Sequence, residues 1–208
     1  MQEGWLPLFP LEVVLFPRTP LPLHIFEERY KEMVGEAIAA GSEFGVVLAR
    51  EKGIVNVGCT ATVAEVTRRY PDGRLDILAI GRRRFEVILL NEEKAYLRAQ
   101  VHIFDDEDTT VAPLETRTKA MEAVAAMQRL LSETVSPPAP DDPELSFQLA
   151  QHIPDLDLRQ VLLRSKSEAD RIAMLAEQVP PLMARLSYVA RVKQRAPQNG
   201  HAHQARLG

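Results

Sequence analysis

Prolines divide the N-terminal apolar segment of this chain into short pieces. A proline has no backbone N–H, so it cannot pair fully in the middle of a sheet. The prolines of this segment are Pro10, Pro17, Pro20 and Pro22. The apolar runs Leu6–Phe9 and Val13–Phe16 are therefore predicted to be short strands that lie at a sheet edge or end at a proline. A helix becomes possible only after Pro22.

From Phe26 onward the spacing of the apolar residues becomes helical. Steps of three and four residues connect Phe26, Tyr30, Met33, Val34, Ala37 and Ile38. Charged residues fill the positions between them, so we expect one face of this helix to pack and the other to meet water.

Beyond this helix the apolar residues alternate, which is typical of strands. The predicted strands are Phe44–Arg50, Val57–Tyr70, Arg74–Ile80, Phe85–Leu90 and Ala95–Phe104. Asp72-Gly73 is a tight-turn sequence, so the second and third of these strands should form a hairpin. Roughly six short strands with one early helix predict a small curled sheet or an open barrel.

Four consecutive acids, Asp105–Asp108, end the β-rich part, and the pattern after them is helical. We therefore expect a β-rich domain over residues 1–110, a helical subdomain over 111–195 and a disordered tail over 196–208. Helices are predicted at Leu114–Val135, Pro143–His152, Leu158–Arg164 and after Ser165–Glu168, which has the pattern of a capping box. Pro180-Pro181 should break or kink the last helix.

The composition excludes several classes of protein. A chain of 208 residues with 46% hydrophobic content can build the core of one large or two small domains. A net charge of −4 argues against a protein that mainly neutralises phosphates. One cysteine excludes an internal disulfide, and no apolar run is long enough to span a membrane. We expect a soluble, cytoplasmic protein.

The sequence predicts neither a catalytic site nor a cofactor. It has no G-x-x-x-x-G-K-[ST] phosphate loop. Ser165 and Lys166 are neighbours at a helix start, which favours capping over catalysis. No metal site is predicted, because His24, His102 and His152 lack a zinc-like arrangement of partners. The only cysteine, Cys59, lies on an alternating strand and is predicted to be a small core residue.

Two basic clusters, Arg68-Arg69 and Arg82–Arg84, leave several interpretations open. Successive strand residues point to opposite sides, so neither cluster makes one basic face. A solvated strand end is the leading interpretation. The alternatives are an RNA-binding surface and an ionic contact with the helices or with a protein partner.

Several segments resemble the N-terminal domain of Lon proteases, and resemble still more closely the stand-alone bacterial proteins that consist of that domain. The matching blocks are Leu6–Leu11, Val14–Pro17, Pro22–Tyr30, Phe44–Val47, Val57–Ala61, Pro71–Arg74 and Gly81–Phe85, followed by Leu149-Ala150, Gln160–Leu163 and Ala169–Ile172. His24 and Cys59 depart from the usual residues of these blocks. The resemblance covers about residues 5 to 187 and implies a PUA-like pseudo-barrel with one inserted helix, followed by a helical bundle.

The resemblance also implies a non-enzymatic module that recognises unfolded or partner polypeptides in an adaptor or chaperone-like role, with possible self-association. We expect no ATPase or protease domain, because 208 residues are already used by barrel and bundle. The alternatives are a PUA-like RNA-binding protein, an oligomerisation or scaffold module, and a hydrolase. The expected site is the groove between barrel and bundle. The residues predicted to contribute from the first helix are Phe26, Glu28, Arg29, Tyr30, Glu32 and Met33.

Overall fold

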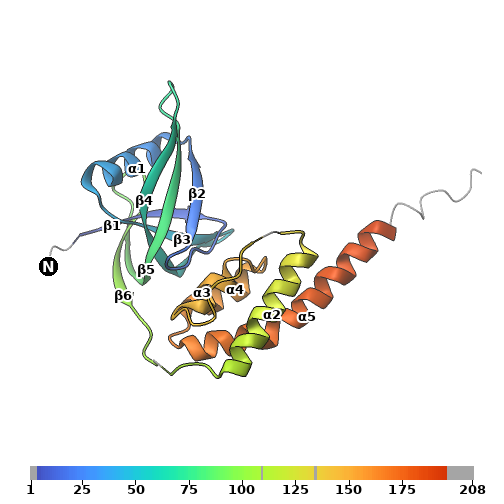
Figure 1. Ribbon diagram of the computed structural model, residues 1–208. Helices are drawn as coiled ribbons and strands as arrows, with labels where there is room; N and C mark the ends of the chain where they lie inside the picture. The colour runs from blue at the N-terminus through green and yellow to red at the C-terminus, as the bar shows by residue number, and fades with distance from the viewer. Residues whose placement is uncertain (1–3, 109, 134, 196–208) are drawn as a thin grey trace, which may run out of the picture.

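The computed structural model describes residues 4–108, 110–133 and 135–195, which form a β-barrel followed by a group of helices (Figure 1). The strands are β1 (Leu6–Leu11), β2 (Pro20–Ile25), β3 (Phe44–Arg50), β4 (Gly53–Arg69), β5 (Leu75–Asn91) and β6 (Arg98–Phe104). The helices are α1 (Glu28–Ala40), α2 (Leu114–Leu130), α3 (Leu145–Ala150), α4 (Leu156–Arg164) and α5 (Glu168–Arg195). The predicted α+β fold with C-terminal helices is confirmed. None of these helices is long and apolar enough to cross a membrane.

Five strands close into the barrel in the order β5-β4-β3-β1-β6, with β6 pairing back onto β5. The β1–β3 pair is parallel, and the other pairs are antiparallel. A small buried apolar cluster, the inner cluster, consists of Leu8, Val47, Phe85 and Ala99. Val101 and Ile103 of β6, together with Leu97 just before the strand, pack against it, which confirms the alternation predicted for this segment.

The second strand lies later in the sequence than predicted. Val13–Phe16 is not a strand, because the helical subdomain supplies its partners instead of a neighbouring strand. Val14, Leu15 and Phe16 are buried, and the carbonyl of Val14 accepts a hydrogen bond from Arg159 of α4. The strand is instead β2, which pairs only with β5. That edge position suits its two prolines.

The predicted hairpin is present, although its second strand is longer than expected. Tyr70 N–H donates to the carbonyl of Arg74 at 3.0 Å, and Gly73 has a φ of 85° at the turn. The prediction of two strands, Arg74–Ile80 and Phe85–Leu90, is wrong. They are one strand, β5, because β4 pairs across the intervening residues, with Ala61 opposite Gly81 and Cys59 opposite Arg84.

Helix α1 covers the side of the barrel that faces away from the other helices (Figure 1). It buries Tyr30, Met33, Val34 and Ala37, and the ring of Tyr30 lies 4.2 Å from that of Phe9 between centroids. The helix ends at Gly41, whose φ of 60° is left-handed. It begins at Glu28, so Phe26 precedes it instead of belonging to its apolar stripe.

In the helical subdomain, α2 packs along α5, while α3 and α4 lie nearer the barrel (Figure 1). The core between them includes Val124, Met127, Ile172, Leu175 and Val179. Of the two outcomes predicted for Pro180-Pro181, a break or a kink, the break does not occur, since α5 continues through both prolines to Arg195. Both prolines are exposed, so their rings displace no neighbouring element.

The predicted capping box is wrong in its details. The residue that caps α5 is Ser167, whose Oγ accepts a hydrogen bond from the N–H of Asp170 at 3.2 Å. The Glu168 carboxylate does not turn back to Ser165. It accepts hydrogen bonds from the N–H and Oγ of Ser146 on α3 instead.

A buried ionic cluster, which we call the joint, fixes the barrel to the helices. It consists of Arg84, Asp106, Ser146, Glu168 and Arg171. Arg171 is fully buried and donates to both oxygens of Asp106, at 2.7 and 2.6 Å. Arg171 also bonds to Glu168 at 2.7 Å, and Arg84 of β5 donates to Asp106 at 2.6 Å. Two cations and two anions therefore compensate one another across the two parts of the molecule.

A candidate polypeptide-binding groove

A groove with a volume of about 420 Å³ lies between α4 and the middle of α5. Its apolar lining consists of Leu158, Val161, Pro181 and Leu182, and its polar lining of Asp155, Asp157, Gln178 and Arg185. Such an apolar floor with charges at its rim can accept an apolar side chain while the rim contacts polar groups of the ligand. The lining of the groove therefore suits an apolar ligand with polar groups at its ends.

Two acids at the start of α4 set the shape of the groove. Asp155 caps the helix, because its Oδ1 accepts hydrogen bonds from the N–H groups of Asp157 and Leu158 at 3.1 and 3.0 Å. Its other oxygen pairs with Arg185 of α5 at 2.9 Å. Asp157 pairs with Arg50 at the end of β3. The groove is thus held by α4, α5 and the barrel together.

Pro181 gives the groove a backbone feature as well as an apolar ring. It lies inside α5 and has no N–H. The carbonyl of Glu177, four residues earlier, therefore cannot receive its usual helical hydrogen bond from this residue. This acceptor lies on the same helix as Pro181, which lines the groove.

An exposed apolar surface continues along α5 beyond the groove. Tyr188 is 64% exposed, and Val189 and Val192 are also exposed. On the α4 side of the groove, Val161 is 51% exposed. Figure 1 shows this end of α5 extending past the other helices, so the other helices of the described residues leave it uncovered. Clustered exposed apolar side chains of this kind mark interaction surfaces.

The residues predicted as the binding site divide into two sets. Phe26 is 59% exposed, and its ring stacks on His24 with the centroids 5.9 Å apart. The charged residues Glu28, Arg29 and Glu32 lie at the surface, with ion-pair partners Lys31, Glu27 and Lys94. Tyr30 and Met33, which were also predicted to contribute to the site, are instead buried against the barrel.

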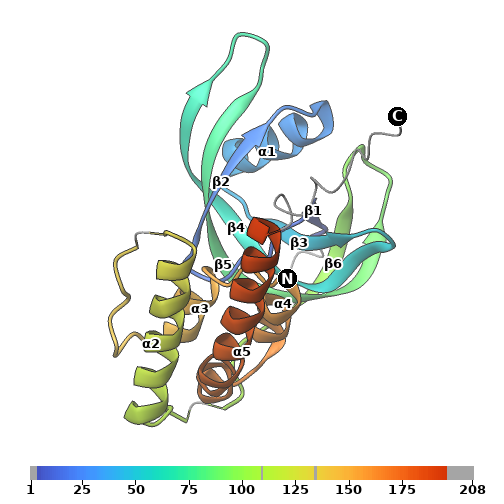
Figure 2. The ribbon, with the colours of Figure 1, turned by 90° about the vertical axis from the view of Figure 1, so that its right-hand side faces the viewer.

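Helix α1 and the groove also lie apart, contrary to the prediction that this helix borders the groove between barrel and helices. Both views place the barrel strands between α1 and the helical subdomain (Figures 1 and 2). Two separate surfaces must therefore be considered: the groove, and the exposed face of α1 with Phe26.

Sequence reasoning missed the groove residues, although one signal was present. From Leu182 to Val192 the apolar residues of α5 cover more than one helical face. One neighbouring helix can bury only a single stripe of these apolar residues. Tyr188 and Val192 lie outside that stripe, and this was the signal that the sequence offered. Val161 could not be singled out, because the other apolar residues of the same stretch, Leu158, Leu162 and Leu163, do pack.

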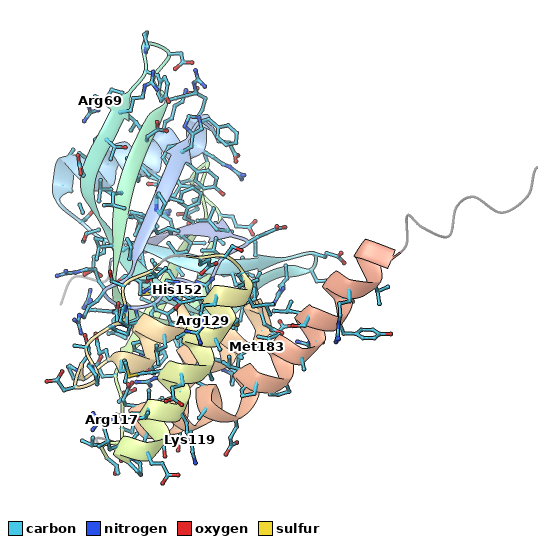
Figure 3. All side chains as sticks on the ribbon, turned by 45° about the vertical axis from the view of Figure 1, so that its right-hand side comes forward. Arg69, Arg117, Lys119, Arg129, His152 and Met183 are labelled. Atoms are coloured by element: carbon cyan, nitrogen blue, oxygen red, sulfur yellow. The ribbon has the colours of Figure 1, made fainter. Side chains whose placement is uncertain are left out.

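Basic residues lie at both ends of the described part of the molecule. Figure 3 places Arg69 at the tip of the β4–β5 hairpin and Arg117 with Lys119 at the opposite end of the molecule. Within Arg82–Arg84, the solvated interpretation is confirmed for exposed Arg82 and Arg83, and Arg83 pairs with Glu43. It is wrong for Arg84, which is buried in the joint.

The reactive side chains are placed for structure. Burial raises the pKa of the Cys59 thiol to about 12, and this residue lies in the core, as predicted. Lys166 pairs with Glu107 instead of approaching the Ser165 hydroxyl. Burial also lowers the pKa of His152. Among the described residues, no group of three or more His, Cys, Asp or Glu side chains could hold a metal ion.

Comparison with known proteins relates this architecture to one family. The family model described as ATP-dependent protease La (LON) substrate-binding domain matches residues 5–181. The Lon protease of Roseiflexus castenholzii is 31% identical over 145 residues, which are 66% of this chain and 18% of that protein. The Lon protease of Parabacteroides distasonis is 30% identical over 109 residues, 49% of this chain and 13% of that protein. The chain thus spans less than a fifth of the length of these curated relatives.

Solved structures agree with this relation. The crystal structure of a Lon N-terminal domain protein from Xanthomonas campestris has a TM-score of 0.68 at 25% identity, covering 84% of this chain and 98% of that one. The N-terminal domain of the Mycobacterium avium complex Lon protease shares the fold, with a TM-score of 0.63 at 15% identity, covering 85% and 98% of the two chains. The chain belongs to the ATP-dependent protease La (LON) substrate-binding domain family.

Proposed function

We propose that this protein binds unfolded polypeptides through exposed apolar segments, as a non-enzymatic adaptor or chaperone-like module related to proteolysis in the cytoplasm. The observation that carries the proposal is the α4–α5 groove with its apolar floor and the uncovered apolar surface of α5 beside it. The family description, a substrate-binding domain, supports a polypeptide as the ligand.

The physical character of the groove predicts weak binding. A shallow groove must order a flexible chain, and this ordering offsets much of the contact energy, so dissociation constants on the order of micromolar are expected. Apolar burial supplies the affinity. Raising the salt concentration from about 50 to 200 mM should therefore change it less than roughly tenfold, whereas several phosphate contacts would cause a far larger loss.

A charge placed in the groove tests the proposal. Val161→Asp should weaken the binding of a fluorescent unfolded peptide by about tenfold or more, because a carboxylate resists burial under an apolar ligand. Val111→Asp is the control, since Val111 is also exposed, at 71%, and precedes α2, away from the groove. Fluorescence anisotropy gives the affinities, and circular dichroism checks folding. The absence of wild-type binding at about 100 μM would refute the proposal. Equal binding by both variants would exclude the groove as the binding site.

Assays of activity test the non-enzymatic part. The purified protein should neither hydrolyse ATP nor cleave casein, with or without ATP, because the sequence lacks a phosphate loop. Activity that stays with the protein through successive columns would contradict this expectation.

A second copy of the chain is the competing occupant of the apolar surface on α5. Sedimentation at the concentrations of the binding assay distinguishes the two. Self-association through this surface would give dimers that the unfolded peptide dissociates. A monomer that still binds the peptide would leave the polypeptide as the occupant.

A further inference from the structure

The barrel is not paired along its whole length. The pairing of β4 with β5 ends at Val57 opposite Glu86, although β4 begins at Gly53 and β5 continues to Asn91. Beyond that point, β4 pairs with β3 and β5 pairs with β6. Among the residues that the structure describes, each strand therefore has one free edge, and Figure 2 shows the β3–β4 and β5–β6 ends as separate hairpins. We call the free edge of Val87–Asn91 the β5 edge.

Three consecutive apolar side chains are exposed on the β5 edge. Ile88, Leu89 and Leu90 are 65%, 54% and 43% exposed. Edge strands are usually protected by charged residues, prolines or a covering element, because their unpaired N–H and C=O groups invite another strand. Here a register shift between Val87 and Leu89 is the only such irregularity within the edge, and the side chains themselves are apolar.

The β5 edge also borders the barrel interior. Val87 on β5 and Ile54 on β4 are partly buried, and both pack against the inner cluster. Successive side chains of a strand alternate between its two faces. A strand added at this edge would therefore place every second side chain beside Val87 and the inner cluster. Its backbone would form hydrogen bonds with the unpaired N–H and C=O groups of β5.

The charges at the ends of the β5 edge restrict the ligand further. Glu86 and Glu92 flank it, and neither forms an ion pair within the described part of the chain. Glu86 accepts only an amide hydrogen bond, from Asn56 at 3.0 Å. A ligand with lysine or arginine beside its apolar stretch would complement these carboxylates.

We propose that the β5 edge takes an extended apolar segment, flanked by basic residues, as an additional strand. The inference rests on the proposed function and names the substrate class and the mode of recognition. In strand addition, backbone hydrogen bonds give affinity and alternate side chains give selectivity. A helix cannot supply the row of backbone groups that an edge requires, because its own backbone groups are already paired.

Backbone methylation of the ligand tests the mode without altering the protein. The probe is a fluorescent peptide of about seven residues with alternating valine and threonine between two lysines. Two analogues carry one N-methyl group each, at adjacent central residues. Strand addition predicts that at least one analogue loses about tenfold or more in affinity, since it loses an N–H without a change of side chain. Equal affinity of all three peptides would overturn the inference.

Variants locate the site. Ile88→Lys with Leu90→Lys should weaken probe binding by about tenfold, whereas the matched pair Val111→Lys with Leu114→Lys, at exposed residues before and at the start of α2, should not. Amide exchange should slow at Val87–Asn91 when the probe is added. If the β5 variant and its amides show no effect while Val161→Asp still weakens binding, the edge inference fails and the proposed function stands. If the wild type binds no unfolded peptide, both fail.

Discussion

Gly81 determines how the N-terminal loop approaches β5. Its carbonyl accepts a hydrogen bond from the N–H of Arg18 at 2.8 Å, and its own N–H donates to the carbonyl of Thr19 at 3.0 Å. A Cβ atom on Gly81 would lie 2.0 Å from the carbonyl oxygen of Phe16. The loop can therefore reach the strand only where no side chain intervenes.

Two glycine-to-alanine substitutions test this contact. Gly81→Ala should lower the free energy of unfolding by about 1–3 kcal/mol or more, because the methyl group meets backbone that cannot move aside. Gly35→Ala is the control, since nothing lies within 4 Å of its Cβ position on α1. It should raise the free energy of unfolding by about 0.5–1 kcal/mol through helix propensity. Urea titration gives both values, and a neutral Gly81→Ala would contradict the contact.

At this scale, sequence reasoning succeeded where the neighbouring residues carried the information. Alternation predicted that Cys59 lies in the core, and the structure confirms it. It failed for Arg84, because its partner Asp106 lies 22 residues away and Ser165, whose carbonyl it also binds, lies 81 residues away. No local pattern distinguishes an arginine that will be buried with compensation from one that remains in water.

Among the elements, the exposed face of α1 is the second surface that we propose for polypeptide contact. Its residues are Phe26, at the entry to the helix, and Glu28, Arg29 and Glu32. All four are at the surface, whereas Tyr30 and Met33 anchor the helix in the core. A sequence shows helical periodicity readily, but which face of a helix remains free depends on elements that lie far away in the chain.

Charge reversal tests this face. Changing Glu28 and Glu32 to Lys and Arg29 to Glu should alter which unfolded peptides bind, because charges at a rim set selectivity. Folding should not change, since exposed ion pairs contribute little to stability. A peptide array gives the selectivity, and circular dichroism gives the folding control. An unchanged binding pattern would restrict polypeptide contact to the groove and the β5 edge.

The elements themselves were predictable where their signals were local. Asp72-Gly73 indicated the β4–β5 hairpin correctly. Val13–Phe16 was not predictable as a loop, because α4 supplies the hydrogen bond to Val14 from 145 residues away. For the same reason the groove was found only once α4 and α5 had been placed beside each other.

For the whole molecule, the joint links stability to pH through two carboxylates whose pKa values shift in opposite directions on folding. Burial raises the pKa of Glu168, and the bonds from Ser146 and Arg171 offset this only in part. Burial would also raise the pKa of Asp106, but the bonds from Arg171 and Arg84 outweigh it and hold that pKa below its ordinary value. As the pH falls, the folded state therefore binds a proton at Glu168 at a higher pH than the unfolded chain does. It binds one at Asp106 at a lower pH than the unfolded chain does.

These opposite shifts predict two pH windows. As the pH falls from neutral to about 4.3, the ordinary value for Glu, the folded state takes up a proton at Glu168 first, so this residue's contribution raises the free energy of unfolding. Below about 3.9, the ordinary value for Asp, the unfolded chain protonates first at Asp106, and this contribution falls.

Two variants separate the windows. The free energy of unfolding is measured by urea titration across this pH range. Glu168→Gln should remove its rise between neutral pH and about 4.3, and Asp106→Asn should remove its fall below about 3.9. Asp106→Asn should also be less stable at neutral pH, because it leaves Arg84 and Arg171 with too little compensating charge. Identical pH profiles of the two variants and the wild type would contradict the assignment.

Cys59 makes the opening of the barrel measurable in the unmodified protein. Its thiol is fully buried and resists ionisation, so a thiol reagent can modify it only in molecules that have opened around it. When reclosing outpaces the reaction, the modification rate reports the population of the open form. A ligand that binds only the closed barrel would slow the reaction in proportion to its occupancy. The modification rate of Cys59 can therefore report ligand binding without an added label.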